Sequence, residues 1–168
     1  MQHNPMDTTS TDTICAISTP HGTGGIAVVR VSGPQATAIV ARRWRGADIA
    51  AMRSHTAHLG TVTDSNSSPL DQVVLTLFRA PHSYTGEDVI ELSCHGSMWI
   101  QRQLVLSLID AGCRAATGGE FTQRAFANGR LDLSQAEAVA DLIAAQSRAA
   151  HRVAINQMRG AFSRQLSQ

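Results

Sequence analysis

Two charged residues stand in the middle of apolar segments, Arg30 within residues 26–32 and Glu91 within residues 89–95. Around each of them hydrophobic residues recur at every second position, which is the period of a half-buried strand. We therefore predict two strands, each carrying one charged side chain on its polar face. The simplest interpretation is an arginine that reaches solvent, or a plain ion pair between Arg30 and Glu91.

A small-ligand site is the alternative interpretation, built from Arg30, Glu91 and the loop that contains Arg130. A carboxylate accepts two parallel hydrogen bonds from a heterocycle with an amino group beside a ring N–H, an edge that guanine and pterin both present. A nearby arginine would pair with a carboxylate or carbonyl group of the same ligand. The glycine-rich segment 22–25 would let the backbone approach closely. No residue has the setting of an activated nucleophile, so the chemistry predicts binding and no catalytic residue.

Composition narrows the class of protein. The 168 residues fit one domain, or one domain with a piece of a second, and the net charge of +1 gives no field that would attract nucleic acid. All 14 basic residues are arginine. The absence of lysine excludes Schiff-base chemistry and a lysine-containing phosphate loop.

The cysteines and the hydrophobic runs indicate the cellular compartment. Cys15, Cys94 and Cys113 lack the spacing of a metal site, so we predict buried free thiols in a reducing compartment and no bound metal. The chain shows no signal-like segment and no apolar run of the roughly 20 residues that cross a membrane. We therefore expect a cytoplasmic protein without membrane contact.

The order of elements predicts an α+β fold, with a mixed sheet and helices on one of its faces. Strands are expected at 13–18, 26–32, 55–63, 71–78, 89–95 and 113–116, and helices at 34–45, 97–111, 120–128 and from 134 onward. In the last segment Ser134 and Glu137 fit a capping box, and Ser147 fits the start of a second helix. We expect a disordered tail over 1–12, a first domain over 13–117, and the first helices of an incomplete helical domain over 118–168.

Five segments resemble the N-terminal region of the tRNA-modification GTPases of the MnmE (TrmE) family, and they occur in the family's order. They are 12–14 with the glycine-rich loop, 25–33 (GIAVVRVSG), 84–91 (YTGEDVIE), 118–126 (GGEFTQRAF) and 131–138 (LDLSQAEA). The resemblance implies a folate-binding fold similar to that of aminomethyltransferases, followed by the start of an all-α domain.

The same resemblance implies a ligand and its contacts. The family positions that contact a tetrahydrofolate derivative, in its 5,10-methylene or 5-formyl form, match Arg30, Glu91 and Arg130. The third position is often lysine in relatives, so Arg130 keeps the charge with a different geometry. Ser97 stands where relatives tend to have a second glycine after His-Gly, which changes the local loop.

The resemblance also implies partners and a reaction. Members form homodimers through this N-terminal domain and act with the FAD-dependent protein MnmG in a heterotetramer-type complex that engages tRNA. Together they add an aminomethyl-type group to C5 of the wobble uridine, with the carbon supplied by methylene-tetrahydrofolate. GTP hydrolysis, with magnesium and potassium, drives the cycle. The present sequence has no G-x-x-x-x-G-K-[ST] motif, so we do not expect it to hydrolyse GTP by itself.

Two other functions stay open at this point. One is a free-standing folate-dependent one-carbon transferase, against which the apolar helical segment argues because it is suited to packing on further helices. The other is a structural dimer scaffold in which Arg30 and Glu91 form an internal ion pair.

Overall fold

The computed structural model describes residues 12–160, so the tail expected over 1–12 lies, apart from Asp12, outside the described residues. The described chain forms two compact units. The first comprises residues 12–83 and 87–118, and the second comprises residues 84–86 and 119–160. The short segment 84–86 therefore leaves the first unit just before the strand that carries Glu91.

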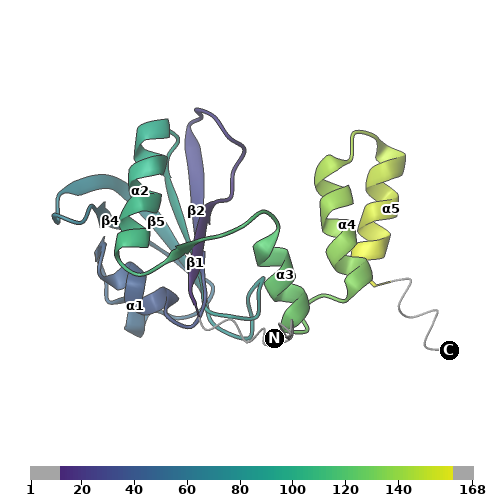
Figure 1. Ribbon diagram of the computed structural model, residues 1–168, viewed down its shortest axis with the longest axis horizontal. Helices are drawn as coiled ribbons and strands as arrows, with labels where there is room; N and C mark the ends of the chain where they lie inside the picture. The colour runs from purple at the N-terminus through teal and green to yellow at the C-terminus, as the bar shows by residue number, and fades with distance from the viewer. Residues whose placement is uncertain (1–11, 161–168) are drawn as a thin grey trace, which may run out of the picture. The chain divides into compact units, whose positions relative to one another are not determined.

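A seven-stranded sheet forms the first unit, with the order β3-β4-β5-β6-β2-β1-β7 (Figure 1). Its neighbouring strands are antiparallel, except that β1 and β7 are parallel, which confirms the predicted mixed sheet. The strands are β1 Ile14–Ile17, β2 Ile26–Ser32, β3 Trp44–Arg45, β4 Thr56–Thr63, β5 Pro69–Phe78, β6 Val89–His95 and β7 Arg114–Ala115. The strand boundaries of β2 agree with the predicted ones.

Helices α1 (Ala36–Ala41) and α2 (Met98–Asp110) pack with a short 3-10 helix, η1 (Ile49–Ala51), against one face of the sheet. Alternate residues of the central strands point into this core, among them Val29, Leu75 and Leu92, which are fully buried. Leu104 and Leu108 of α2 meet them from the helix side. The intervening residues of β2 and β6, including Arg30 and Glu91, lie on the opposite face of the sheet.

Helix α1 ends at Ala41, so the prediction of a helix as far as Arg45 was wrong at its C-terminal end. Trp44 instead begins β3 and pairs with Val62 of β4. Its ring lies over Gly60, where an added Cβ would meet the ring at 2.2 Å, and its indole N–H donates to the Ala47 carbonyl. Packing of this aromatic residue on the sheet therefore overrides the helical spacing of the preceding residues.

The second unit contains α3 (Glu120–Ala127), α4 (Leu133–Ala144) and α5 (Arg148–Met158). Ser147 caps α5 as predicted, because its Oγ accepts the N–H of Ala150 at 3.1 Å. The capping box of α4 was predicted two residues too late. Asp132 accepts the N–H of Gln135 at 2.8 Å, and the Gln135 side chain accepts the N–H of Asp132 at 2.9 Å.

Helices α4 and α5 pack closely through small residues, since Ala138 and Ala154 are buried. The larger apolar residues Ile143 and Val153 stay exposed on the same helices. The end of the helical segment predicted from residue 134 onward, residues 161–168, lies outside the described residues. Within residues 12–160 no helix has the length and hydropathy needed to span a membrane.

The three cysteines are buried free thiols, as predicted. Burial raises the pKa of the Cys94 thiol, and the Asp71 carboxylate raises it further. A hydrogen bond with Cys15 raises the pKa of Cys113, and the same bond lowers that of Cys15. Among the described residues no group of three His, Cys, Asp or Glu side chains is placed to hold a metal ion.

Candidate functional site

Arg30 and Glu91 meet on the face of the sheet opposite α1 and α2, at the centre of the antiparallel β2–β6 pair. Arg30 Nε donates to Glu91 Oε1 at 2.9 Å, and Arg30 Nη2 lies 2.8 Å from the same oxygen. The structure therefore brings together the two residues that strand period and resemblance singled out. Their side chains are 24% and 28% exposed, so both remain accessible from solvent.

The two oxygens of Glu91 are used differently. Oε1 accepts both contacts from Arg30, whereas no donor within residues 12–160 binds Oε2. A carboxylate offers about four lone-pair positions, so Glu91 can accept further hydrogen bonds without releasing Arg30. The pair thus leaves an oriented acceptor that a ligand can reach.

Small side chains surround the Arg30–Glu91 pair. Ala16 of β1 is the cross-strand neighbour of Arg30, and Thr76 of β5 is the cross-strand neighbour of Glu91. One step along the strands, Val28 lies opposite Ser93 on the same face. Thr76 and Ser93 therefore place hydroxyl groups on the same face of the sheet as the carboxylate.

A second acidic residue, Glu87, fixes the start of β6. Its Oε2 accepts the hydroxyl of the buried Ser32 at 2.6 Å. Asp88 accepts the N–H of Ala80 through its side chain and the N–H of Gly33 through its carbonyl. The sequence reasoning missed both roles, because Glu87 and Asp88 precede the alternating segment and so carry no periodic signal.

Residues 84–86 and Arg130 both belong to the second unit. The Tyr84 hydroxyl lies 2.8 Å from the Thr122 hydroxyl, and the Thr85 carbonyl accepts the amide of Asn128 at 2.8 Å. Gly86, at a φ of +81°, passes so close to Arg130 that an added Cβ would lie 3.1 Å from its Cγ. The Tyr-Thr-Gly segment therefore packs on α3 and the loop after it, beside the third predicted contact residue.

These strands and loops fall within a known family. The family described as GTP-binding protein TrmE N-terminus matches residues 13–130 of the chain. The chain belongs to this family. The match spans the sheet, both helices of the first unit, α3 and the loop as far as Arg130.

Curated relatives agree with the TrmE assignment. The chain is 54% identical over 160 residues to the tRNA modification GTPase MnmE of Parabacteroides distasonis, 53% over 156 residues to that of Cytophaga hutchinsonii and 52% over 159 residues to that of Flavobacterium psychrophilum. Each alignment covers 93% of this chain but only 34–35% of the relative. The chain thus spans about a third of the length of these MnmE proteins.

The glycine-rich loop of this TrmE domain contacts β6 and α2. Gly24 donates to the Gly96 carbonyl at 3.2 Å, and Gly96 donates to the Gly25 carbonyl at 3.3 Å. The buried Gln101 side chain donates to the carbonyls of Gly22 and Gly96. The close backbone approach expected of these glycines therefore occurs at Gly96.

Replacing Gly96 by alanine is expected to displace this loop. The new Cβ would lie 2.2 Å from the Gly24 carbonyl oxygen and 2.6 Å from its carbon, which are backbone atoms that cannot move alone. We expect a loss of about 1–3 kcal/mol in unfolding free energy, typical of overpacking, measured by urea denaturation. Gly118→Ala is the matched control, since nothing lies within 4 Å of its added Cβ. Equal stability of the two variants would contradict the described loop.

Ser97, which follows the His-Gly pair, is the N-cap of α2. Its Oγ accepts the N–H of Ile100 at 3.4 Å. The preceding His95 is exposed, with its Nδ1 2.8 Å from Asp71 Oδ1, while Cys94 on the opposite face is buried. Cys94 and His95 therefore point to opposite faces of the sheet.

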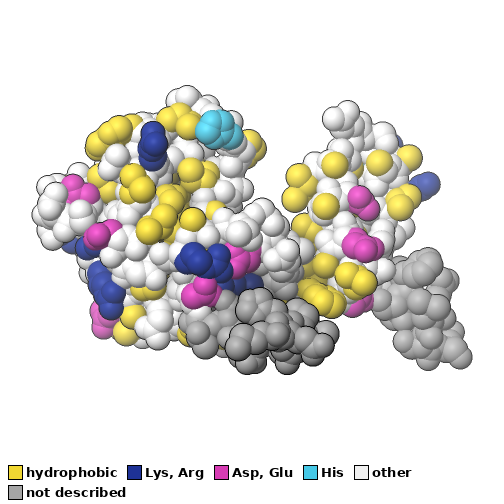
Figure 2. All heavy atoms as spheres, in the orientation of Figure 1, with side chains coloured by type: hydrophobic (Ala, Val, Ile, Leu, Met, Phe, Trp, Pro, Cys, Tyr) yellow, Lys and Arg dark blue, Asp and Glu magenta, His cyan; other side chains and the backbone are white. Residues whose placement is uncertain are grey.

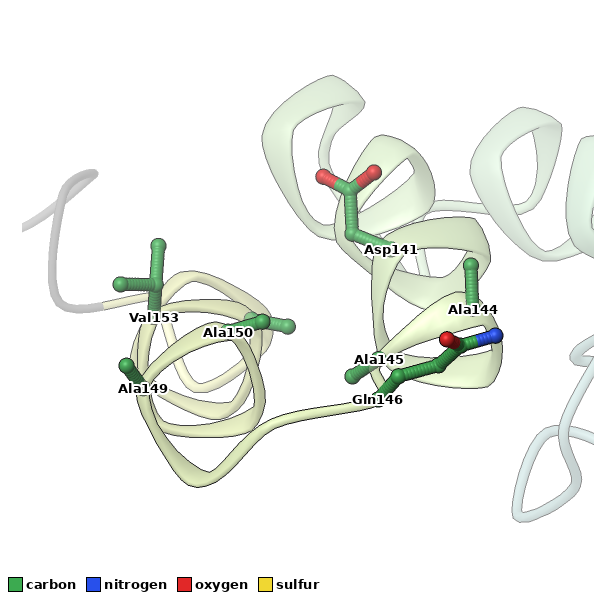
Figure 3. Close-up of a pocket in the computed structure, with 8 residues that line it drawn as sticks. Asp141, Ala144, Ala145, Gln146, Ala149, Ala150 and Val153 are labelled. Atoms are coloured by element: carbon green, nitrogen blue, oxygen red, sulfur yellow. The ribbon is translucent and has the colours of Figure 1, made fainter.

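A hollow of about 460 Å³ lies between α4 and α5 in the second unit (Figure 3). Its lining consists mostly of alanine, with Asp141 and Gln146 as polar members. Ala150 and Val153 come from α5, and Ala144 and Ala145 from the end of α4 and the residue after it. The hollow contains none of the predicted ligand contacts.

Proposed function

We propose that this chain is the tetrahydrofolate-binding and dimerisation part of a tRNA-modification GTPase. The observation that supports the proposal is the Arg30–Glu91 pair, partly exposed at the centre of the sheet with Glu91 Oε2 open to a donor. Membership of the TrmE N-terminal family supports the same proposal.

The pair suits a pterin edge for a chemical reason. The 2-amino group and the adjacent ring N–H of a reduced pterin are two parallel donors, and a carboxylate is the acceptor that matches them in geometry. In this proposal one pterin N–H donates to the open Oε2 and the other takes the place of one of the two Arg30 contacts on Oε1. The remaining contact from Arg30 holds the carboxylate in place, so that less rotamer freedom is lost when the ligand binds. Arg130 is proposed as a third contact, for a carboxylate of the ligand, on the resemblance alone.

The wider activity is proposed from the relatives, which are named tRNA modification GTPases. In this proposal the complete protein is a cytoplasmic homodimer that acts with FAD-dependent MnmG on the wobble uridine of tRNA. Its one-carbon unit comes from 5,10-methylene-tetrahydrofolate. GTP, magnesium and potassium bind outside the 168 residues, which by themselves do not hydrolyse GTP.

Calorimetric titration of the chain with 5-formyl-tetrahydrofolate tests the proposal. We expect saturable binding, and sedimentation of the same sample is expected to show a dimer. The absence of binding would favour the scaffold interpretation, in which Arg30 and Glu91 are only an ion pair. A monomer at micromolar concentration would contradict the proposed dimerisation and leave the ligand site standing.

A further inference from the structure

The solvent-facing side of α2 is unusually apolar. Its exposed hydrophobic residues are Met98, Trp99, Leu106 and Ile109, with 37%, 61%, 51% and 37% of their surface accessible. These four residues form an apolar stripe along the helix. The opposite side of the same helix fills the core with Leu104 and Leu108. A helix that is apolar on both sides is typical of one that is covered on both sides, and exposed apolar patches of this kind mark interaction surfaces.

A hollow of about 450 Å³ runs along this side of α2, lined also by Ile17 from β1 and His21 from the following loop. Figure 2 shows hydrophobic side chains gathered over α2 with a basic side chain among them, and a histidine beside them over the loop between β1 and β2. The lining is apolar except for His21 and Arg102, and it contains no carboxylate. Trp99, the largest exposed side chain in the stripe, has the character of a binding hot spot.

Arg102 lies at the centre of the stripe, one turn from Trp99 and one turn from Leu106. It makes no hydrogen bond or ion pair with any residue between 12 and 160. An occupant that covers the stripe would remove this guanidinium from water, which is costly unless a carboxylate pairs with it. The positive charge of Arg102 therefore favours a partner that brings an acidic side chain to this surface.

The position of Arg102 also helps to decide whether this surface of α2 binds a second copy of the chain or another protein. In a two-fold pairing of antiparallel α2 helices centred on the stripe, each Arg102 would face its symmetry mate. Like charges placed opposite each other across an interface are strongly unfavourable, so Arg102 argues against a second copy as the occupant.

The stripe of exposed hydrophobic residues continues past the hollow to Ile109, over three turns or roughly 16 Å of helix, a length that suits another helix.

We propose that this side of α2 binds an amphipathic helix of a partner protein. Its apolar side chains would cover Trp99 and Leu106, and an Asp or Glu between them would pair with Arg102. The surface lies beyond the helix layer, on the other side of the sheet from Arg30 and Glu91, and the proposal is independent of the ligand proposed there.

The test uses the full chain and two synthetic helical peptides of roughly 16 residues, about four turns. Both carry leucines at i, i+3, i+4 and i+7, and they differ only in a Glu or a Lys between the leucines. Binding is measured by calorimetry. We expect the Glu peptide to bind about ten-fold more tightly than the Lys peptide, and Arg102→Glu to reverse that preference. Trp99→Ala is expected to abolish binding while leaving thermal stability unchanged, since Trp99 is mostly exposed.

Arg53→Glu is the matched control, because Arg53 is an exposed arginine whose side chain has no partner in the described structure. It should leave the preference for the Glu peptide intact. Equal binding of both peptides, or no binding of either, would overturn the proposal. So would a dimer that Trp99→Ala converts to monomer in sedimentation, because the surface would then belong to a second copy of the chain.

Discussion

Replacing Glu91 by glutamine is expected to weaken the binding of 5-formyl-tetrahydrofolate by about 10- to 150-fold. Glutamine keeps the size of the side chain but presents one acceptor and one donor, so one of the two pterin N–H groups would face an NH₂ group. Hydrogen bonds that involve a charged partner contribute about 1.5–3 kcal/mol, and this range converts to the stated factor. Calorimetry on the variant and the wild-type chain measures the change.

Stability separates a ligand contact from a structural ion pair at this position. The Arg30–Glu91 pair is partly exposed, and pairs near the surface contribute about 0–1 kcal/mol to folding. We therefore expect the urea midpoint of Glu91→Gln to change little while its affinity falls. Glu137→Gln, at an exposed position on α4, is the control and should bind like the wild type. Unchanged affinity of the Glu91 variant would remove Glu91 from the site.

Replacing Gly33 by alanine is expected to destabilise the first unit by about 3–5 kcal/mol, the sum of backbone strain and overpacking. Gly33 has a φ of +144°, which side chains rarely adopt, and an added Cβ would lie 2.6 Å from both Cα and Oγ1 of Thr13. Thr13 is buried and accepts the N–H of Gln35 through that hydroxyl. The clash would therefore separate β1 from the junction between β2 and α1.

Urea denaturation of Gly33→Ala beside Gly25→Ala measures this effect. Gly25 lies in the same unit, without a positive φ and with nothing within 4 Å of its added Cβ. We expect the Gly25 variant to unfold within about 1 kcal/mol of the wild type, and the Gly33 variant to be strongly destabilised or unfolded. Similar unfolding curves for the two variants would contradict the junction described for residues 13 and 33.

The alternation of hydrophobic residues predicted the two central strands, β2 and β6, well, because one face of each strand is fully buried. Val29 and Leu92 are completely inaccessible, so the alternation around them is regular and the orientation of Arg30 and Glu91 follows from it. That the two strands are neighbours, with Arg30 opposite Glu91, required the structure. The alternation of hydrophobic residues predicts the face of the sheet on which a side chain lies, but it does not predict which strands are neighbours.

Two predictions of helix boundaries were wrong, for different reasons. Trp44 leaves the helical pattern because its ring packs on Gly60, which is remote in sequence. The capping box shifted to Asp132 and Gln135 because Asp, Gln, Ser and Glu all suit these positions, and local pattern alone did not separate the two registers. The sequence pattern did not reveal which residues contact the glycine-rich loop, because Gly96 and Gln101 lie about 75 residues further along the chain.

Arg30 and Glu91 lie far apart in sequence but on neighbouring central strands of the sheet, and this affects how fast their amide hydrogens exchange with solvent. The contact joins residues 61 positions apart, and β2 lies between β1 and β6 with hydrogen bonds to both. Local fraying cannot separate two central strands, so their amide hydrogens exchange with solvent only when the whole sheet opens. Hydrogen exchange at Arg30 and Glu91 therefore reports the global unfolding of the first unit, and the geometry of the pair persists as long as that unit is folded.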